Sequence, residues 1–109
     1  MADPISELFR RSEMLEVALK ESGKRGKAAA EAEREYRIAL ASKILELRDK
    51  GFPATLIPDV ARGDKTVAGL KFDRDVSQVV YDNAKEAINA YKKQIDILRE
   101  QIDREWKNA

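Results

Sequence analysis

Carboxylate and basic side chains are the groups in this chain that could do acid–base, metal or phosphate chemistry, because it contains no cysteine and no histidine. This composition removes the thiolate nucleophile, the Cys-ligated zinc site and the commonest general base. The carboxylates gather as Glu31, Glu33 and Glu35; Asp73 and Asp75; and Asp96, Glu100 and Asp103. Helical residues two apart face different directions, and Arg99, Arg104 and Lys107 neutralise the last group. We therefore expect no metal site, no cofactor, no catalytic residue and no enzymatic activity.

Basic residues form short clusters that could contact phosphates. They are Arg10-Arg11, Lys24-Arg25-Lys27, Arg62 with Lys65, and Lys71 with Arg74. The 21 basic and 20 acidic residues nevertheless leave a formal charge of +1, so no net field draws the chain to nucleic acid or anionic lipid. Direct nucleic-acid binding through Lys24, Arg25, Lys27, Arg62 and Lys65 is therefore the alternative interpretation.

Three short motifs have simpler explanations than the functions they suggest. Residues 22–27, SGKRGK, lack the spacing of a phosphate-binding loop. A helix-turn-helix would place Pro58 and Gly69 where that motif needs compact or branched core residues. The tripeptide Arg62-Gly63-Asp64 is best explained as a helix end followed by a helix cap.

Two amphipathic helices are expected in the first half of the chain. Asp3 and Pro4 suit the start of the first helix, which ends near Glu21. Its apolar stripe consists of Ile5, Leu8, Ser12, Leu15 and Leu19. The glycines of residues 22–27 predict a flexible basic loop. A second helix follows from about residue 28 to residue 50, with its stripe at Ala32, Tyr36, Leu40, Ile44 and Leu47, and Gly51 is a credible stop.

The last segment is expected to form a long helix that begins near Lys65 or Val76 and reaches Trp106. Apolar residues alternate spacings of three and four, as in a coiled coil. The seam consists of Tyr81, Ala84, Ile88, Tyr91, Ile95, Leu98 and Ile102. It could form the core of a monomer or an interface between two copies, and we expect self-association as a homodimer through Tyr81, Ile88, Tyr91, Ile95, Leu98 and Ile102.

Residues 51–75 interrupt the helices with prolines and glycines, and we interpret them as a packed elbow that reverses the chain. A short helix is expected to start near Ile57, with Pro58 in its first turn. Gly63 ends it and Asp64 caps the next helix. The elbow is expected to be plugged by the apolar residues Phe52, Leu56, Ile57, Val60, Val67, Leu70 and Phe72.

The predicted fold class is therefore all-α: a long antiparallel, coiled-coil-like helical hairpin with a short elbow helix and an N-terminal helix. The predicted divisions are 1–27, the N-terminal helix with its basic loop, and 28–109, the hairpin with its elbow at 51–75. The chain has no run of 18 apolar residues and no apolar leader, which predicts neither membrane spanning nor secretion, and hence a cytoplasmic location.

Two long stretches resemble known sequences: EREYRIALASKILELRDKGFPATLIPDVARGDKTVAGLKFDRDV and YDNAKEAINAYKKQIDILREQIDREW. They resemble small helical proteins of temperate bacteriophages and prophages of Gram-positive bacteria, over about residues 33–106. The resemblance implies a phage origin, action inside the infected host cell and no enzymatic machinery. Small phage proteins of this type are commonly accessory factors in DNA metabolism or inhibitors of host defence, including anti-CRISPR proteins.

The sequence and the resemblance together lead to one expected function. The chain is expected to bind a host or phage nucleic-acid-processing protein, such as a CRISPR effector, and to modulate it by occupying its surface. The expected partner-binding residues are Arg62, Lys65, Lys71, Arg74 and Trp106, since arginine and tryptophan are common interface anchors. The alternatives are direct DNA or RNA binding and a structural or assembly role in the virion.

Overall fold

The computed structural model describes residues 3–108, and these form three α-helices. α1 spans Pro4–Asp49, α2 spans Ile57–Gly63 and α3 spans Lys65–Lys107. The prediction of an all-α helical hairpin is confirmed. The chain divides into two units. We call residues 25–80 the elbow unit; the terminal unit combines α1 up to Lys24 with α3 from Tyr81 onward.

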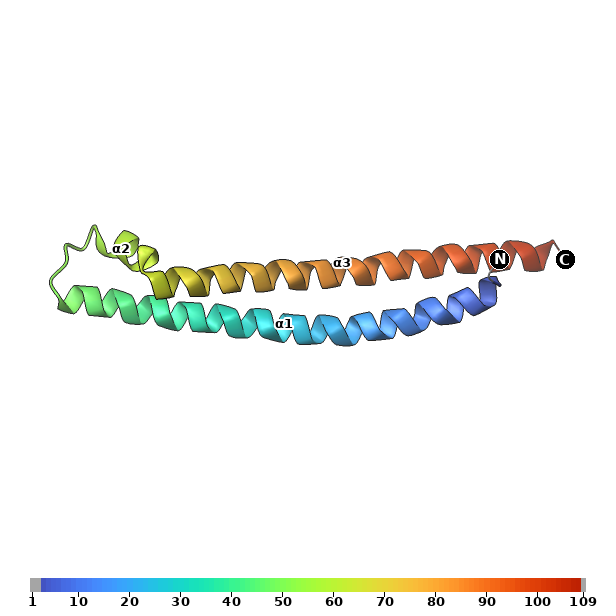
Figure 1. The fold of residues 1–109 in the computed structure, drawn as a ribbon. Coiled ribbons are helices and arrows are strands. Elements are labelled where there is room, and N and C mark those ends of the chain that lie inside the picture. The colour runs from blue at the N-terminus through green and yellow to red at the C-terminus, as the bar shows by residue number, and fades with distance from the viewer. Residues whose placement is uncertain (1–2, 109) are drawn as a thin grey trace. The chain divides into compact units, whose positions relative to one another are not determined.

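The elbow unit pairs the second half of α1 with α2 and the start of α3, and the two long segments run antiparallel (Figure 1). Its core residues are Ala29, Tyr36, Leu47, Ile57, Ala61 and Val67, all buried. The predicted stripe of the second helix is confirmed: Tyr36 and Leu47 are buried, and Ala32, Leu40 and Ile44 are half-buried. This unit holds nearly all of the buried apolar side chains described, so it is the better packed of the two.

The terminal unit pairs the start of α1 with the end of α3, again antiparallel (Figure 1). Ile88 is buried there, and the other seam residues of α3 are half-buried. On α1 the observed stripe differs from the predicted one. Leu8 and Leu15 are half-buried, but Ile5 and Leu19 are exposed. The buried face of α1 is therefore rotated toward Met14 and Ala18 and away from Ser12, whose hydroxyl donates to the carbonyl of Leu8 at 2.9 Å.

The predicted flexible loop at residues 22–27 is wrong, because α1 continues through Gly23 and Gly26. A glycine inside a helix costs about 1 kcal/mol relative to alanine. That cost is small beside the packing of the long segments on either side, and Ala28, Ala29 and Ala30 directly follow. The first 27 residues are therefore no separate N-terminal helix with a loop, and the division observed falls within α1 and α3.

The elbow is shorter than predicted, because α3 already begins at Lys65 and includes residues 65–75. The elbow begins with a turn at Gly51, which ends α1. Gly51 has a φ of 83°, its N–H donates to the carbonyl of Arg48 at 3.0 Å, and the N–H of Phe52 donates to Leu47 at 3.1 Å. These two bonds satisfy carbonyls that the end of a helix leaves unpaired. The predicted stop at Gly51 and the predicted short helix from Ile57, with Pro58 in its first turn, are confirmed.

We expect the helical and the elbow glycines to respond oppositely to alanine. Apart from the neighbouring backbone of its own helix, nothing lies within 4 Å of the place that a Cβ on Gly23 would occupy, so Gly23→Ala should raise the free energy of unfolding by about 0.5–1 kcal/mol. Gly51→Ala should lower the free energy of unfolding by about 1 kcal/mol or more, because a side chain is strained at positive φ. Urea unfolding followed by circular dichroism measures both, and a stabilised Gly51→Ala would contradict the glycine stop.

Candidate functional site

The elbow, residues 50–64, is anchored to α1 by apolar contacts. Ile57 and Ala61 lie on the inner side of α2 and pack with Leu47, and Leu40 and Ile44 of α1 pack against this cluster. Ala61 has no exposed surface at all. The N–H groups of Leu56 and Ile57 both donate to the carbonyl of Pro53, at 2.9 and 3.3 Å. A loop fixed in this way presents its outer residues to a partner at low entropic cost.

The outer side of the elbow carries an apolar surface. Phe52, Leu56 and Val60 are all exposed, and we call them the elbow patch. Leu56 and Val60 are four residues apart, so they share the side of α2 that faces away from the core. Arg62 lies at the end of α2 and forms a 3.7 Å ion pair with Asp59, in which both side chains remain largely exposed. The elbow therefore presents apolar side chains with an exposed arginine beside them.

Asp64 joins the elbow to both long helices. Its Oδ2 accepts hydrogen bonds from the backbone N–H groups of Thr66 and Val67, each at 3.1 Å, as the predicted cap of α3. Its Oδ1 lies 3.3 Å from the Nζ of Lys43 on α1. The hydrogen bond from Val67 is the main reason that the pKa of Asp64 lies below its ordinary value, and Lys43 lowers it further. Asp64 is therefore a structural carboxylate.

Lys43 continues this network along α1. Its Nζ lies 3.2 Å from Glu46, whose other oxygen lies 2.9 Å from Lys50. The bond to Glu46, followed by the bond to Asp64, raises the pKa of Lys43. The bond from Lys50, followed by that from Lys43, lowers the pKa of Glu46. Each shift favours the charged form of the group, because the opposite charge beside it stabilises that form.

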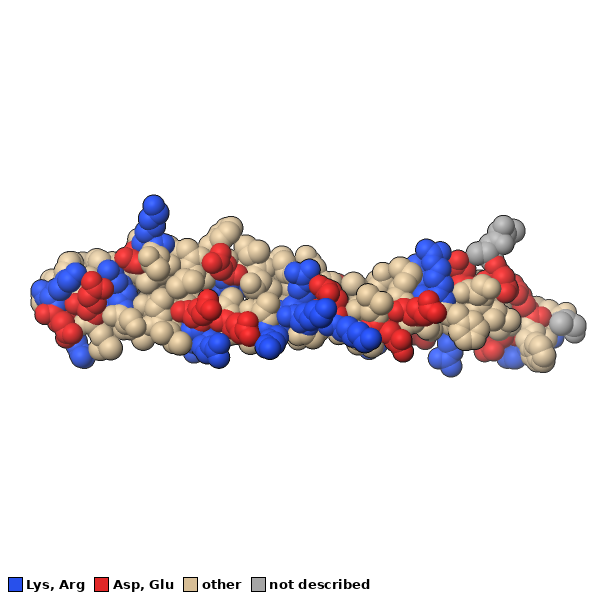
Figure 2. All heavy atoms as spheres, turned by 60° about the horizontal axis from the view of Figure 1, so that its bottom comes forward, with Lys and Arg blue, Asp and Glu red and all other residues tan. Residues whose placement is uncertain are grey.

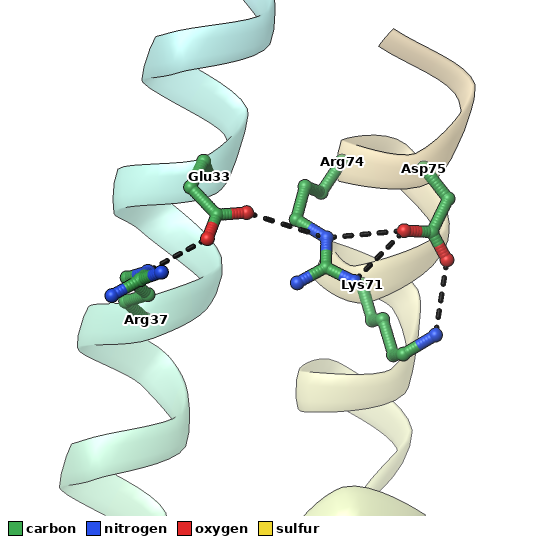
Figure 3. A network of polar contacts seen from close by, with 5 residues as sticks. All are labelled: Glu33, Arg37, Lys71, Arg74 and Asp75. Atoms are coloured by element: carbon green, nitrogen blue, oxygen red, sulfur yellow. Dashed lines mark hydrogen bonds and ion pairs between the residues drawn. The ribbon is translucent and has the colours of Figure 1, made fainter. Parts of the chain in front are cut away.

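A second network connects α1 and α3 further from the elbow (Figure 3). The Nε of Arg74 lies 3.3 Å from Glu33 across the two helices, and its Nη2 lies 2.9 Å from Asp75. Glu33 also accepts from Arg37 at 2.6 Å, and Asp75 accepts from Lys71 at 3.0 Å. The hydrogen bond from Arg37 is the main cause that lowers the pKa of Glu33. The hydrogen bond from Lys71 is the main cause that lowers the pKa of Asp75.

Arg74 also stacks on an aromatic ring. Its guanidinium lies 4.6 Å from the centre of the ring of Tyr36, which is buried. The contact combines a cation–π attraction with packing of the side chain. Arg74 of α3 thus reaches α1 through the carboxylate of Glu33 and the ring of Tyr36, and it also pairs with Asp75 on its own helix. Sequence reasoning could not distinguish it from a free surface arginine, because both contacts with α1 depend on how the two helices pair.

The structure separates the five residues predicted to bind a partner. Arg62 and Lys65 are exposed at the elbow and at the first residue of α3, whereas Lys71 and Arg74 belong to the network between the helices. Trp106 is 82% exposed and belongs to the terminal unit, whereas the other four residues belong to the elbow unit. Of these elbow-unit residues, Arg62 and Lys65 are exposed and lie outside the network between the helices.

The alternative nucleic-acid residues lie partly on α1. Lys24, Arg25 and Lys27 are exposed on a continuous helix, and Arg25 has an interaction partner within the chain. Lys24 belongs to the terminal unit and the other members of the set to the elbow unit. On the face drawn in Figure 2, basic and acidic side chains are intermixed. This face therefore does not present the single basic surface that binding to phosphates favours.

The predicted self-association seam faces inward in the terminal unit. Ile88 is buried, and Tyr81, Tyr91, Ile95, Leu98 and Ile102 are half-buried. A groove of about 460 Å³ runs beside the seam, with Met14, Val17 and Ala18 on one side and Ala84, Ala87 and Tyr91 on the other. Glu13 and Glu21 also line it. The seam is thus engaged within one chain, and its use between copies stays a prediction.

Sequence reasoning missed the exposed apolar residues on the outer faces of the long helices. The predicted plug of the elbow is confirmed for Ile57 and Val67, which are buried, but it is wrong for Phe52, Leu56, Val60 and Phe72, which are exposed, Phe72 at 68%. Phe72, Val76 and Val79 repeat at spacings of four and three on α3 and line a shallow hollow of about 260 Å³ with Asp75 and Val80. That spacing was the available signal, because it is a second helical stripe beside the one that forms the core.

Within residues 3–108, no group of three or more acidic residues is arranged to hold a metal ion. None of the described helices has a stretch long and apolar enough to cross a bilayer. Comparison with protein-family models, with curated proteins and with solved structures finds no match to the chain. The candidate site therefore rests on the geometry of the elbow itself.

The lowered pKa of Asp64 leads to a pH prediction. A carboxylate with a folded-state pKa below its unfolded value stabilises the fold above that unfolded value, and the stabilisation is lost as the pH falls through the folded pKa. Stability should therefore decrease below about pH 4, and Asp64→Asn should make that decrease shallower, because asparagine keeps the cap but not the charge.

Urea unfolding at a series of pH values measures this slope. Asp73→Asn is the matched control, because Asp73 makes no ion pair within residues 3–108. The control should retain the wild-type slope. An Asp64→Asn curve that runs parallel to the wild-type curve would show that Asp64 does not stabilise the elbow through its charge.

Proposed function

We propose that this chain is a protein-binding accessory factor that acts by occupying the surface of its partner through the elbow. The elbow patch of Phe52, Leu56 and Val60 carries this proposal, because it exposes apolar side chains on a segment anchored by Ile57 and Ala61. Apolar residues at the centre and charged residues at the rim are the usual composition of a protein interface. Arg62 and Lys65 would form part of that rim.

The partner surface that fits the elbow is an apolar depression with acidic groups near its edge. Phe52, Leu56 and Val60 would lose water on binding, and an acidic edge would pair with Arg62 and Lys65. The resemblance to phage proteins supports a partner among the nucleic-acid-processing proteins of a host or a phage, such as a CRISPR effector. Inhibition by occlusion needs no reactive group, only a surface that excludes the partner's substrate.

Direct nucleic-acid binding remains the second candidate, since Lys24, Lys27 and Lys65 are exposed lysines. It predicts an affinity that falls steeply with salt, because each phosphate contact releases counterions. The intermixed charges of the face in Figure 2 favour the protein partner.

The test uses a pair of substitutions that remove the elbow contact and preserve the fold. Leu56 is exposed at the start of α2 and makes no side-chain cap bond, so Leu56→Asp removes exposed apolar surface without breaking a hydrogen bond of its side chain. Arg62→Gln removes the rim charge. In pull-downs from nuclease-treated lysate of Gram-positive cells, we expect the wild type to retain a stoichiometric partner and the double variant to retain about tenfold less.

Val17→Glu provides the control, because Val17 is 68% exposed and belongs to the terminal unit. It should retain the partner as the wild type does. Recovery of nucleic acid alone, lost after nuclease treatment, would reject the protein-binding proposal in favour of the second candidate. A partner that the double variant retains in full would reject the elbow as the contact.

A further inference from the structure

The terminal unit buries far fewer apolar side chains than the elbow unit does. Of the seven buried side chains within residues 3–108, six belong to the elbow unit and one, Ile88, belongs to the terminal unit. On α1, Leu8 and Leu15 are only half-buried, and Phe9 and Val17 are exposed. Because hydrophobic stabilisation grows with buried apolar area, the pairing of the two helices is weaker in the terminal unit.

Ion pairs differ between the two units in the same sense. In the elbow unit, two ion pairs connect α1 with later segments of the chain. In the terminal unit, Arg10 and Arg11 both pair with Glu7 on α1, and Lys85 pairs with Asp82 on α3. These contacts join residues three or four apart on one helix. They support each helix by itself and do not hold α1 against α3.

A buried polar atom further weakens the terminal unit. The Oε1 of Gln94 on α3 is buried and accepts no hydrogen bond within residues 3–108. Burial removes this oxygen from water without replacing the hydrogen bond that water would provide, which disfavours the closed form. Separation of the two helices returns the oxygen to water and removes that cost.

Gly23 lies within the α1 segment of the terminal unit, where the packing does not require a glycine. Apart from the neighbouring backbone of its own helix, nothing lies within 4 Å of the place that a Cβ would occupy. Its φ is not positive, so an alanine would fit the backbone as well. A glycine inside a helix is less favourable than alanine, because it loses more conformational freedom on folding. Gly23 therefore lowers the helical stability of this segment of α1.

From these observations we propose that the terminal unit opens in one cooperative step while the elbow unit stays folded. A helix of about 20 residues is marginal in water without a packed partner, so residues 4–24 of α1 should unwind as they leave α3. The opening uncovers the apolar seam of α3 around Ile88.

The α1 segment of the terminal unit is thus a removable cover of the seam. The seam residues are buried or half-buried in the closed form, so a contact between copies through them would require this opening first. The elbow patch belongs to the other unit and is not involved. The proposed opening is therefore independent of the proposed elbow contact.

Native-state hydrogen exchange measures this opening in the purified full chain, read by mass spectrometry at a series of low urea concentrations. Amides of residues 4–24 and 81–107 should share one opening free energy and one dependence on urea. After correction for intrinsic rates, they should exchange about tenfold or more faster than amides of residues 36–47 in the elbow unit. Simple fraying would instead give protection that declines gradually toward each end of the chain.

Two substitutions in the terminal unit should slow this exchange. Gly23→Ala should slow it about threefold, because alanine stabilises the helix. Gln94→Leu should slow it about fivefold, because it removes the buried oxygen that lacks a hydrogen bond. Gly69→Ala is the matched control, since Gly69 lies in α3 within the elbow unit and also has nothing near the place of its Cβ. It should slow exchange in the elbow unit and leave that of the terminal unit unchanged.

Three results would overturn the proposal. The first is equal protection of the two units, and the second is protection that declines gradually toward the ends. The third is a Gly69→Ala chain in which exchange slows by the same factor in both units, because the chain would then open only as a whole. These measurements use no partner, so their outcome is separate from that of the pull-down.

Discussion

Two antiparallel helices can bury only the stripe along which each faces the other, and this constraint governs the whole molecule. In the elbow unit the buried side chains are those of Ala29, Tyr36, Leu47, Ile57, Ala61 and Val67. Hydrophobic stabilisation grows with buried apolar area, so a single stripe provides a thin core. The ion pairs between the helices and the packing at the elbow therefore contribute a larger share of the stability here than they would in a larger domain.

The elbow shows how that thin core is closed at one end. Ala61 has no exposed surface, and its small side chain allows α2 to pack directly on α1. Asp64 then caps α3 and pairs with Lys43 of α1 in the same few residues. Backbone hydrogen bonds, apolar contacts and one carboxylate thus fix the direction of α3 relative to α1 within this unit, and they also fix the outward position of the elbow patch.

Two ion pairs, from Lys43 to Asp64 and from Glu33 to Arg74, connect α1 with later segments and favour one register of the helices. Arg74 contacts Glu33 and Tyr36 on the opposite helix, which makes it specific to one alignment of α1 and α3. Exposed ion pairs of this kind contribute little energy individually. A bridge that needs both a carboxylate and a ring at fixed positions nevertheless disfavours a shifted alignment. The apolar residues of the elbow patch lie outside these networks and stay exposed.

The sequence by itself determined the helical class, the glycine stop at Gly51, the short helix from Ile57 and the cap at Asp64, because these depend on local backbone preferences. Only the tertiary structure decided that α1 continues through Gly23 and Gly26, since packing on either side outweighs a small local penalty. It also decided that Arg74 is bound to Glu33 and that Phe72 faces water. A stripe of apolar residues shows that a helix has a face, but which of two stripes becomes buried depends on the partner helix.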